Sequence, residues 1–305
     1  MGTDMIKILL LGKNGQVGWE LQRSLAPLGE LIALDRHSSD LCGDISKLSD
    51  LADTVRTVAP DVIVNAAAHT AVDKAEAEPE LARTLNTLAP QVLAQESARL
   101  GAWLVHYSTD YVFDGSGEQP WHESDPTGPL SVYGATKLEG ERLIAAHNPK
   151  HLVFRTSWVY AARGGNFAKT MLRLAQERER LTVINDQFGA PTGAELIADV
   201  SAHVIRHVLR AGPDGAALAG LYHLAASGCT TWFEYAKHVL AQAKQAQSAI
   251  ELKATEIAPV PTSAFPTPAR RPHNSRLDTR KLQATFGLSL PPWQLGVNRM
   301  LAEIL

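Results

Sequence analysis

Short apolar runs alternate with amphipathic stretches along the first half of the chain. Consecutive apolar residues are typical of strands buried on both faces, and apolar residues spaced every three or four positions are typical of helices packed on them. The pattern therefore predicts a parallel sheet covered by helices on both sides. The predicted strands lie at 6–11, 31–34, 62–64, 103–107 and 151–154, and the predicted helices at 17–28, 48–58, 81–100 and 132–147, with the third kinked or split at Pro90.

The alternation becomes less regular after residue 156. Five prolines within residues 259–272 predict a loop. We expect an α/β fold with a doubly wound parallel (Rossmann) sheet in residues 5–156 and a smaller C-terminal α/β substrate-binding domain in 157–305, from which a segment at about 181–225 returns to the first domain. The later predicted elements are helices at 167–178, 193–209 (N-capped by Thr192), 231–245, 279–286 and 293–305, and strands at 181–184 and 221–225.

Composition narrows the class of protein. Of 305 residues, 45% are hydrophobic and 20% charged, and 29 Lys and Arg nearly balance 32 Asp and Glu. These values exclude a disordered chain and a polycationic nucleic-acid surface, and they favour small-molecule chemistry. Cys42 and Cys229 have no CxxC spacing, so we expect a reducing, cytoplasmic location. We expect no signal peptide and no membrane span, and we give residues 1–4 no function.

A glycine-rich loop follows the first predicted strand. It reads GKNGQVG at residues 12–18 and runs into an amphipathic helix. Glycines let a pyrophosphate approach backbone N–H groups, and the helix N-terminus adds partial positive charge. Asp35, at the end of the second strand, is the residue type that hydrogen-bonds an adenosine ribose. Together these features predict dinucleotide binding, although glycine turns of this kind also occur for packing reasons.

Asp35 and Arg36 favour different nicotinamide cofactors. The carboxylate accepts hydrogen bonds from a ribose 2′-hydroxyl and repels a 2′-phosphate, which favours NADH. Arg36 and Lys13 can pair with that phosphate and so favour NADPH. We therefore expect that both cofactors are used.

Three residues form a catalytic constellation. Tyr133 and Lys137 are spaced i, i+4 at the start of a predicted helix, which places them on one face, and Thr109 ends the fourth strand. A phenol has a pKa near ~10, which a nearby ammonium lowers, so that Tyr133 becomes a usable proton donor. With a hydroxyl from Thr109, this site would polarise a carbonyl that receives a hydride from a nicotinamide. An isolated YxxxK is common on exposed helices, and the nucleotide loop upstream gives this one its significance.

Longer strings resemble one known family. The glycine loop, Tyr133 with Lys137, Pro129 and residues 123–125 resemble the extended short-chain dehydrogenase/reductases that act on nucleotide sugars. Within that superfamily the resemblance is to the dTDP-4-dehydrorhamnose reductases, and it extends from residue 5 to the C-terminus. The strings are NAAAHTAVDKAE (65–76), YSTDYVFDG (107–115), FRTSWVYA (154–161), NFAKTMLRLA (166–175), INDQFGAPT (184–192) and RPHNSRLDT (271–279).

The resemblance implies a reaction and a set of residues. The reaction is reduction of the C4 ketone of dTDP-4-dehydro-β-L-rhamnose to dTDP-β-L-rhamnose by NADPH or NADH, the last step in making this sugar donor for bacterial polysaccharides such as O antigen. Tyr133 would donate the proton, Lys137 would lower its pKa and hold the nicotinamide ribose, and Thr109 would complete the triad. Thr109, Asp110 and Trp158 would touch the substrate. The implied cofactor-binding residues are Gly12, Gly15, Gln16, Val17, Gly18, Asp35, Arg36, Asp44, Ile45, Ala68, His69, Thr70, Tyr107, Tyr133 and Lys137.

Several assignments have a structural alternative. Asp44 and Ile45 could equally be residues that only form a turn, and Trp158 could equally be a residue that only packs in the core. His69 is structural or cofactor-lining, because the tyrosine already supplies acid–base chemistry. Arg271, beside Asn274 and Ser275, either clamps the substrate diphosphate or belongs to a solvated basic loop.

The resemblance also implies a homodimer linked by Mg²⁺. The matching carboxylates are Glu20, Glu195 and Glu303, and hard oxygen ligands suit Mg²⁺. The alternative is three solvated glutamates on helix surfaces. The eleven histidines show no HExxH or similar metal-binding spacing.

Three other functions compete with the reductase. A 4,6-dehydratase carries an Asp-Glu pair after the strand-end threonine, whereas this chain has Asp110 and Tyr111, so simple reduction is favoured. A nucleotide-sugar epimerase would retain NAD tightly without net turnover. A non-catalytic NADP-binding regulatory subunit need not keep a catalytic triad, and this chain has one.

Overall fold

The computed structural model describes residues 5–246 and 250–305, and its largest part is one parallel β-sheet. The six strands are ordered β10-β5-β4-β3-β1-β2, and every neighbouring pair is parallel. Numbered along the chain, these strands are ordered 2-1-3-4-5-6, one of the two common orders of doubly wound sheets, with the order reversing between β1 and β3. The predicted Rossmann-like α/β class is therefore confirmed. Residues 1–4, which have no assigned function, lie outside the described residues. The strands are β1 (Lys7–Leu11), β2 (Glu30–Leu34), β3 (Val62–Asn65), β4 (Trp103–Thr109), β5 (His151–Thr156) and β10 (Gly220–His223).

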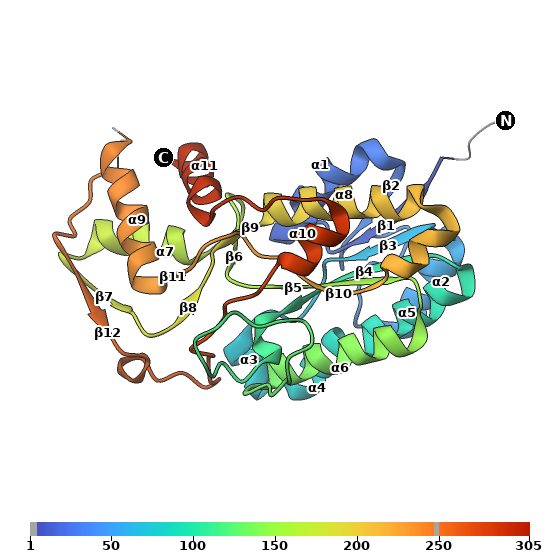
Figure 1. The fold of residues 1–305 in the computed structure, drawn as a ribbon, viewed down its shortest axis with the longest axis horizontal. Helices are drawn as coiled ribbons and strands as arrows, with labels where there is room; N and C mark the ends of the chain where they lie inside the picture. The colour runs from blue at the N-terminus through green and yellow to red at the C-terminus, as the bar shows by residue number, and fades with distance from the viewer. Residues whose placement is uncertain (1–4, 247–249) are drawn as a thin grey trace.

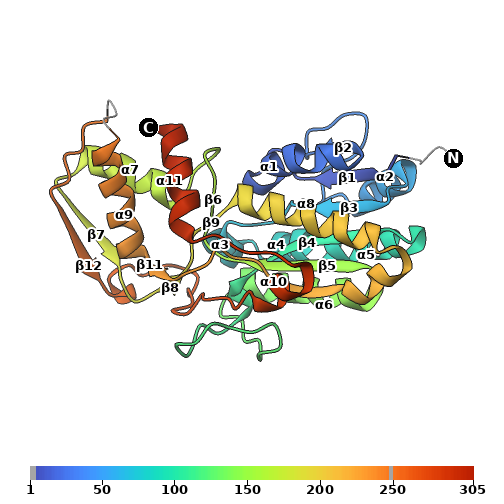
Figure 2. The same cartoon turned by 45° about the horizontal axis from the view of Figure 1, so that its top comes forward.

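Alternate residues of β1 face opposite sides of this sheet. Ile8 and Leu10 are buried in the layer that contains α1 and α8, whereas Leu9 and Leu11 are buried in the layer that contains α2, α5 and α6. Because both faces are covered, the four buried positions from Ile8 to Leu11 are all apolar. Figures 1 and 2 show the two helical layers. The helices are α1 (Gln16–Leu25), α2 (Leu48–Val58), α5 (Ala89–Leu100), α6 (Val132–His147) and α8 (Ala194–Arg210).

A second, smaller core lies at the end of the molecule opposite residue 5, on the left in Figure 1. It is formed by α7 (Phe167–Glu177), α9 (Trp232–Gln245) and α11 (Trp293–Ile304). From this part, α8 and β10 return to the large sheet, and α10 (Arg280–Phe286) packs Leu282 and Phe286 into the core of that sheet. The short strand pairs are β6 (Val159–Tyr160) with β9 (Thr192–Gly193), β8 (Phe188–Gly189) with β11 (Thr230–Thr231), and β7 (Arg180–Ile184) with β12 (Glu256–Val260).

The helix predicted at 81–100 is split, as Pro90 indicated. It consists of α4 (Pro79–Arg83), a π-helical turn (Thr84–Leu88) and α5. Pro90 stands in the first turn of α5, where its missing N–H is tolerated. A further short helix, α3 (Val72–Ala77), precedes α4, and the periodicity did not predict it.

Two local predictions are wrong. Thr192 is not the N-cap of α8, because it lies in β9 and Gly193 occupies the cap position. Pro259 lies in β12 rather than in a loop. The strand β12 belongs to a two-stranded sheet and has one free edge, where a residue without an N–H removes no ladder hydrogen bond.

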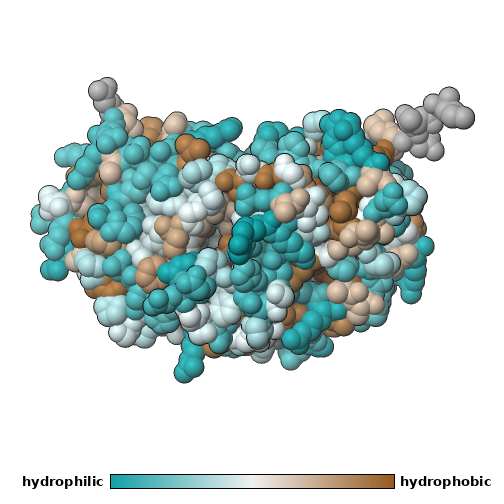
Figure 3. All heavy atoms as spheres, in the orientation of Figure 1, coloured by the Kyte–Doolittle hydropathy of each residue, from teal (hydrophilic) through white to brown (hydrophobic). Residues whose placement is uncertain are grey.

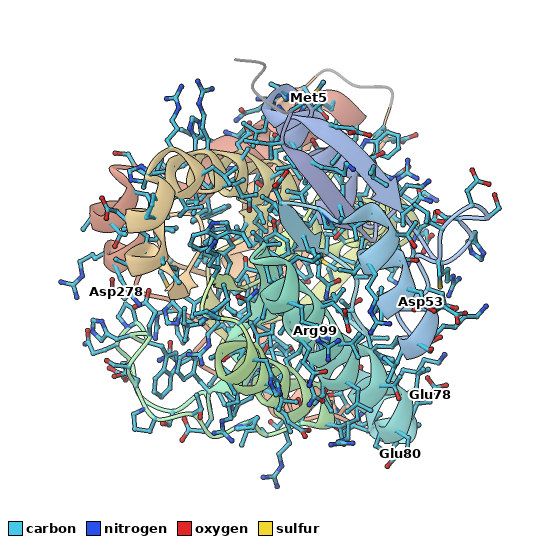
Figure 4. All side chains as sticks on the ribbon, turned by 90° about the vertical axis from the view of Figure 1, so that its right-hand side faces the viewer. Met5, Asp53, Glu78, Glu80, Arg99 and Asp278 are labelled. Carbon is cyan, nitrogen blue, oxygen red and sulfur yellow. The ribbon has the colours of Figure 1, made fainter. Side chains whose placement is uncertain are left out.

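Charged side chains cover the outer surfaces of the helices. On α2 and α5, Arg56 lies 3.1 Å from Asp53 and 2.7 Å from Glu96, and Figure 4 labels Asp53 and Arg99 on these neighbouring helices. On the face drawn in Figure 3, small apolar areas are scattered among polar ones. Among the described residues, no helix has the length and apolarity needed to cross a membrane.

Candidate active site

A cleft of about 980 Å³ runs along the carboxyl ends of β1, β3 and β4. In a doubly wound sheet, ligands bind where the strand order reverses, and β1 and β3 meet at that point. The glycine loop lines one part of the cleft, and the predicted catalytic residues line another. The lining includes the predicted residues Gly12, Gly15, Gln16, Val17, Asp35, Arg36, Asp44, Ile45, Ala68, Thr70, Tyr107, Thr109, Asp110, Tyr133, Lys137 and Trp158.

The glycine loop leaves the first N–H groups of α1 without a side-chain cap. Gly12 has a φ of 85°, which favours glycine, and the N-cap position of α1 is Gly15, which makes no side-chain hydrogen bond. A Cβ on Gly18 would lie 2.0 Å from the carbonyl oxygen of Gly12. Gly18 therefore permits the tight turn, whereas Gly15 stands at a helix N-terminus suited to a phosphate.

His69 serves the fold at the edge of this cleft. It is 8% exposed, its backbone N–H donates to Asn86 Oδ1 at 2.8 Å, and its ring Nε2 lies 3.5 Å from Glu78 Oε2. Asn86 thus holds the backbone of His69, and Glu78 lies beside one nitrogen of its ring. These contacts favour the structural alternative for His69.

Asp35 is an ionised carboxylate that lines the cleft beside Arg36 and Asp44. Its Oδ1 accepts a hydrogen bond from the His37 N–H at 2.9 Å, and the amide of Asn14 donates to Oδ2. Desolvation acts to raise the pKa of Asp35, but the hydrogen bond from His37 and the charge of Lys13 hold it below its ordinary value. Arg36 lines the same end of the cleft, where its Nε donates to His37 Nε2 at 3.1 Å.

Tyr133 presents a protonated phenol to the cleft. The helix α6 begins at Val132 because the hydroxyl of Ser131 caps it, accepting the Gly134 N–H at 3.2 Å. Burial raises the pKa of Tyr133 to about 12, a hydrogen bond with Thr109 opposes this, and the charge of Asp110 adds to it. The phenol therefore carries its proton at neutral pH, as a proton donor must.

The side chain of Lys137 makes its hydrogen bonds to residues of β4 and not to Tyr133. Its side chain is 1% exposed, and Nζ donates to the carbonyl oxygen of Tyr107 and lies 3.0 Å from His106 Nε2. Burial lowers the pKa of Lys137 to about 8, against the opposing charge of Glu141. The predicted lowering of the Tyr133 pKa by Lys137 is thus wrong for this arrangement, because burial of the phenol dominates.

Asp110 is buried directly behind Thr109. It is 2% exposed, and its Oδ1 accepts a hydrogen bond from the Thr109 hydroxyl at 3.1 Å. Burial raises the pKa of Asp110 to about 6, while hydrogen bonds from Ser275 and Thr109 act in the opposite direction. Ser275 therefore belongs to this site, whereas Asn274 supports the loop by donating to the carbonyl of Gln119 at 2.8 Å.

Trp158 borders both the cleft and a second pocket of about 310 Å³. Its ring stacks on Trp232 with centroids 3.6 Å apart, and its φ of 49° lies in the left-handed region. A non-glycine residue held there costs on the order of 1–3 kcal/mol, which surrounding structure must offset. Trp158 therefore combines packing with a position at two cavities, and its contact with substrate stays a prediction.

Comparisons with known proteins agree over the whole chain. The family model described as "RmlD substrate binding domain" matches residues 6–305. The dTDP-4-dehydrorhamnose reductase of Escherichia coli K12 is 61% identical over 299 residues, which cover 98% of each chain. The chain belongs to the dTDP-4-dehydrorhamnose reductase family.

Two solved structures of this reductase family have the same fold. The structure of the dTDP-4-dehydrorhamnose reductase from Clostridium acetobutylicum has a TM-score of 0.86 and 34% identity, and it covers 98% of this chain and 99% of its own. The structure of the enzyme from Bacillus anthracis, in complex with NADP, has a TM-score of 0.85 and 33% identity, and covers 98% of this chain and 100% of its own.

In this reductase-family chain, Arg271 forms an ion pair that was not predicted from the sequence. Its guanidinium pairs with Asp73 through two contacts, at 3.2 and 2.6 Å, and it lines the second pocket beside Trp158. The two alternatives predicted for Arg271, a clamp and a solvated loop residue, both overlook this ion pair. No local pattern indicates this ion pair, because Asp73 and Arg271 are 198 positions apart.

The three carboxylates predicted to bind Mg²⁺ share one region without forming a metal site. Arg299 Nε lies 3.4 Å from Glu195 and 3.7 Å from Glu303. Desolvation raises the pKa of Glu195, Arg299 opposes this, and the charges of Glu303 and Glu20 add to it. Within residues 5–246 and 250–305, no group of three His, Cys, Asp or Glu side chains is arranged to hold a metal ion.

Sequence reasoning missed several residues that line or support the active site. Asn65 and Ser108 stand at the carboxyl ends of β3 and β4 and line the cleft, while Trp232 lines the second pocket. His106 is 1% exposed and contacts Lys137 from β4. A polar residue inside an otherwise apolar strand was the available signal for Asn65 and His106.

Proposed function

We propose that this chain reduces the C4 ketone of dTDP-4-dehydro-β-L-rhamnose to dTDP-β-L-rhamnose with NADPH or NADH. Membership of the reductase family supports the reaction, and NADP in the Bacillus anthracis relative supports the cofactor. The observation that carries the proposal is the cleft itself, which joins the glycine loop to Tyr133 and Thr109. The chain is an NAD(P)H-dependent oxidoreductase.

The cleft fits a dinucleotide. The uncapped N-terminus of α1 suits a pyrophosphate, and Asp35 suits an adenosine ribose. Asp44, Ile45 and Thr70 would contact the remainder of the cofactor. The nicotinamide supplies the hydride when it is bound.

Tyr133 would give its proton to the oxygen of the substrate C4 carbonyl. Its raised pKa keeps the proton in place until the oxygen gains negative charge. Thr109 would donate a hydrogen bond to the same oxygen. Lys137 would hold the nicotinamide ribose and, when charged, stabilise the phenolate that remains.

The sugar nucleotide would lie between Asp110 and the second pocket. Asp110 sits beside Thr109, and the Trp158 ring continues the surface into a pocket lined by Trp232 and Arg271. Flat aromatic rings suit a nucleobase or sugar face. The pairing with Asp73 would orient Arg271 at the edge of this surface.

The decisive experiment is a direct assay. Purified protein is mixed with dTDP-4-dehydro-β-L-rhamnose and NADPH or NADH, and the loss of reduced-nicotinamide absorbance is followed. We expect substrate-dependent oxidation, with dTDP-glucose, which has no C4 ketone, as the inactive control. Absence of oxidation with both cofactors would overturn the proposal.

Organisation and environment complete the proposal. We place dinucleotide binding in residues 5–156, and substrate binding mainly in 157–305, with α8 and β10 returning to the sheet. The free cysteines Cys42 and Cys229 favour a cytoplasmic location. A homodimer, with Mg²⁺ between copies at Glu20, Glu195 and Glu303, remains part of the proposal.

A further inference from the structure

His106 connects β3 to the catalytic lysine inside the protein. Asn65 Nδ2 lies 3.1 Å from His106 Nδ1, and Lys137 Nζ lies 3.0 Å from His106 Nε2. The exposed fraction is 1% for each of the three side chains. The three side chains therefore form one buried chain of hydrogen-bond contacts. The donor that Asn65 presents decides which His106 nitrogen carries hydrogen, and that in turn decides what His106 presents to Lys137.

The orientation of Asn65 determines which nitrogen of His106 carries hydrogen. The Ala67 N–H can only donate, and it donates to Asn65 Oδ1 at 3.1 Å. The Asn65 amide nitrogen therefore faces His106 and must donate as well, because it has no lone pair to accept with. His106 Nδ1 is thus the acceptor, and a neutral ring carries its hydrogen on Nε2, facing Lys137. A doubly protonated ring would place two hydrogens against each other at Nδ1.

An ammonium cannot accept the hydrogen of His106 Nε2, whereas an uncharged amine can. We propose that His106 is a positioning residue that donates Nε2–H to the uncharged form of Lys137 and thereby stabilises that form relative to the ammonium. The N–H groups of that amine remain available, and one of them donates to the Tyr107 carbonyl. The charged form is favoured when Lys137 leaves this contact and takes up a proton from solvent in the cleft that it lines.

The groups around Lys137 agree with this state. Glu141, one turn along α6, favours the charged lysine, but its carboxylate is already paired with Arg155 of β5, at 2.6 Å. Tyr133 of α6 is protonated, and Asp110 after β4 has a pKa raised to about 6 by burial. Burial keeps the pKa of His106 well below its ordinary value, so the ring stays neutral whether or not Lys137 is charged.

The arrangement predicts how the reaction depends on pH. Charged Lys137 stabilises the phenolate left by Tyr133, so activity falls as pH rises and the lysine loses its proton. A hydrogen bond donated to the neutral amine stabilises the uncharged form and lowers the pKa of Lys137. Removing that donor raises this pKa and moves the alkaline limb of the kcat/KM profile to higher pH.

Two variants test the proposal from opposite sides. His106→Phe removes the donor and keeps a ring of similar size. Asn65→Asp offers a carboxylate that accepts Nδ1–H, which turns the Nε2 lone pair toward Lys137. We expect both variants to move the alkaline limb of the kcat/KM profile about one pH unit higher, which is the effect of losing one hydrogen bond of ordinary strength. His151→Phe, at the other end of neighbouring β5, is the matched control and should leave the limb in place.

The kinetic experiment rests on the proposed reductase function. An NMR measurement of the folded protein does not, because it needs no turnover, and it also separates the proposal from a loss of folding. In the wild-type protein, long-range ¹H–¹⁵N spectra of labelled histidine should place the His106 hydrogen on Nε2, and Asn65→Asp should protonate Nδ1. The ¹³Cε signal of Lys137, assigned by its loss in Lys137→Met, should titrate at higher pH in both variants. The proposal would be overturned by an Nδ1–H tautomer in the wild type, or by a folded variant in which the Lys137 titration does not move. A wild-type protein that shows the expected spectra but no activity would overturn the reductase function alone.

Discussion

The side-chain amide of Gln16 donates a hydrogen bond to the backbone carbonyl of Gly165, 3.1 Å away. The same amide contacts the carbonyl of Arg163 at 3.2 Å, and the Arg163 guanidinium lies 4.0 Å from the centroid of the Trp19 ring. The first turn of α1, which follows the glycine loop, is thereby tied to a segment 149 residues away. The glycine loop, where we propose that the cofactor binds, is therefore physically linked to the 161–166 segment.

Gln16→Ala should weaken cofactor binding more than it destabilises the fold. The contacts are exposed, so their loss costs little folding stability, but the segment beside the pyrophosphate site loses its anchor. We expect Kd for NADPH to rise roughly 5–10-fold, about one hydrogen bond. Fluorescence titration measures this, with Gln91→Ala on α5 as the control. An unchanged Kd would show that this anchor is irrelevant to the cofactor.

Tyr133→Phe should remove turnover and leave cofactor binding nearly unchanged. The substitution deletes only the phenolic proton donor, and loss of one acid–base group typically costs ~10²–10⁴-fold in kcat. Steady-state kinetics and NADPH titration separate the two effects. Tyr222→Phe on β10 is the matched control. A variant that keeps more than about a tenth of wild-type kcat would rule out Tyr133 as the proton donor.

Arg36→Ala should separate the two cofactors. The wild-type chain should use both, with kcat/KM values within about 100-fold, or ~2.7 kcal/mol. Because Arg36 and Asp35 line the part of the cleft proposed to hold the adenosine ribose, the variant should raise KM for NADPH and leave KM for NADH nearly unchanged. Lys47→Ala is the control for a general loss of positive charge. An equal effect on both cofactors would mean that Arg36 does not read the 2′-phosphate.

Acid should destabilise the fold through His223. Burial, with the charge of Arg155, lowers the pKa of His223 to about 3 from an ordinary 6.5. Above pH 6.5, His223 is neutral in both the folded and the unfolded chain. As the pH falls below 6.5, the histidine is protonated in the unfolded chain but not in the folded one. The free energy of unfolding therefore decreases until about pH 3, where the folded chain is protonated as well. The loss at pH 5 is about 2 kcal/mol. Urea unfolding at pH 7.5 and pH 5 should show it, and His223→Gln should reduce it; equal pH dependence in both proteins would contradict the assignment.

Magnesium should control association if the carboxylates meet across two copies. Glu195 already lies near Glu303 through Arg299, so a second copy would have to displace that cation or add ligands. We expect a dimer in sedimentation with Mg²⁺ and a shift toward monomer in EDTA. Glu195→Gln should abolish the difference, with Glu177→Gln on α7 as the control. A monomer under both conditions would remove Mg²⁺ and the dimer from the proposed function.

The limits of sequence reasoning are clearest at Lys137. The spacing from Tyr133 correctly placed both on one face of α6, because helix periodicity is local. It did not reveal that the amine lies against His106 and the Tyr107 carbonyl, since β4 is packed against α6 only in the folded chain. Arg271 is a similar case, where the chemistry of the residue was recognisable but its partner Asp73 was not.

The sequence alone determined the parallel sheet, the glycine loop and the catalytic pair, because each depends on residues close together in the chain. Buried strands must be apolar on both faces, a phosphate loop needs glycines before a helix, and a YxxxK pair needs one helical turn. Tertiary structure decided the rest: the neutral state of buried His106, the pairing of Arg271 and the anchoring of Gln16 by Gly165. Burial and partners distant in sequence set the charge and hydrogen bonding of a side chain, and neither exists until the chain is folded.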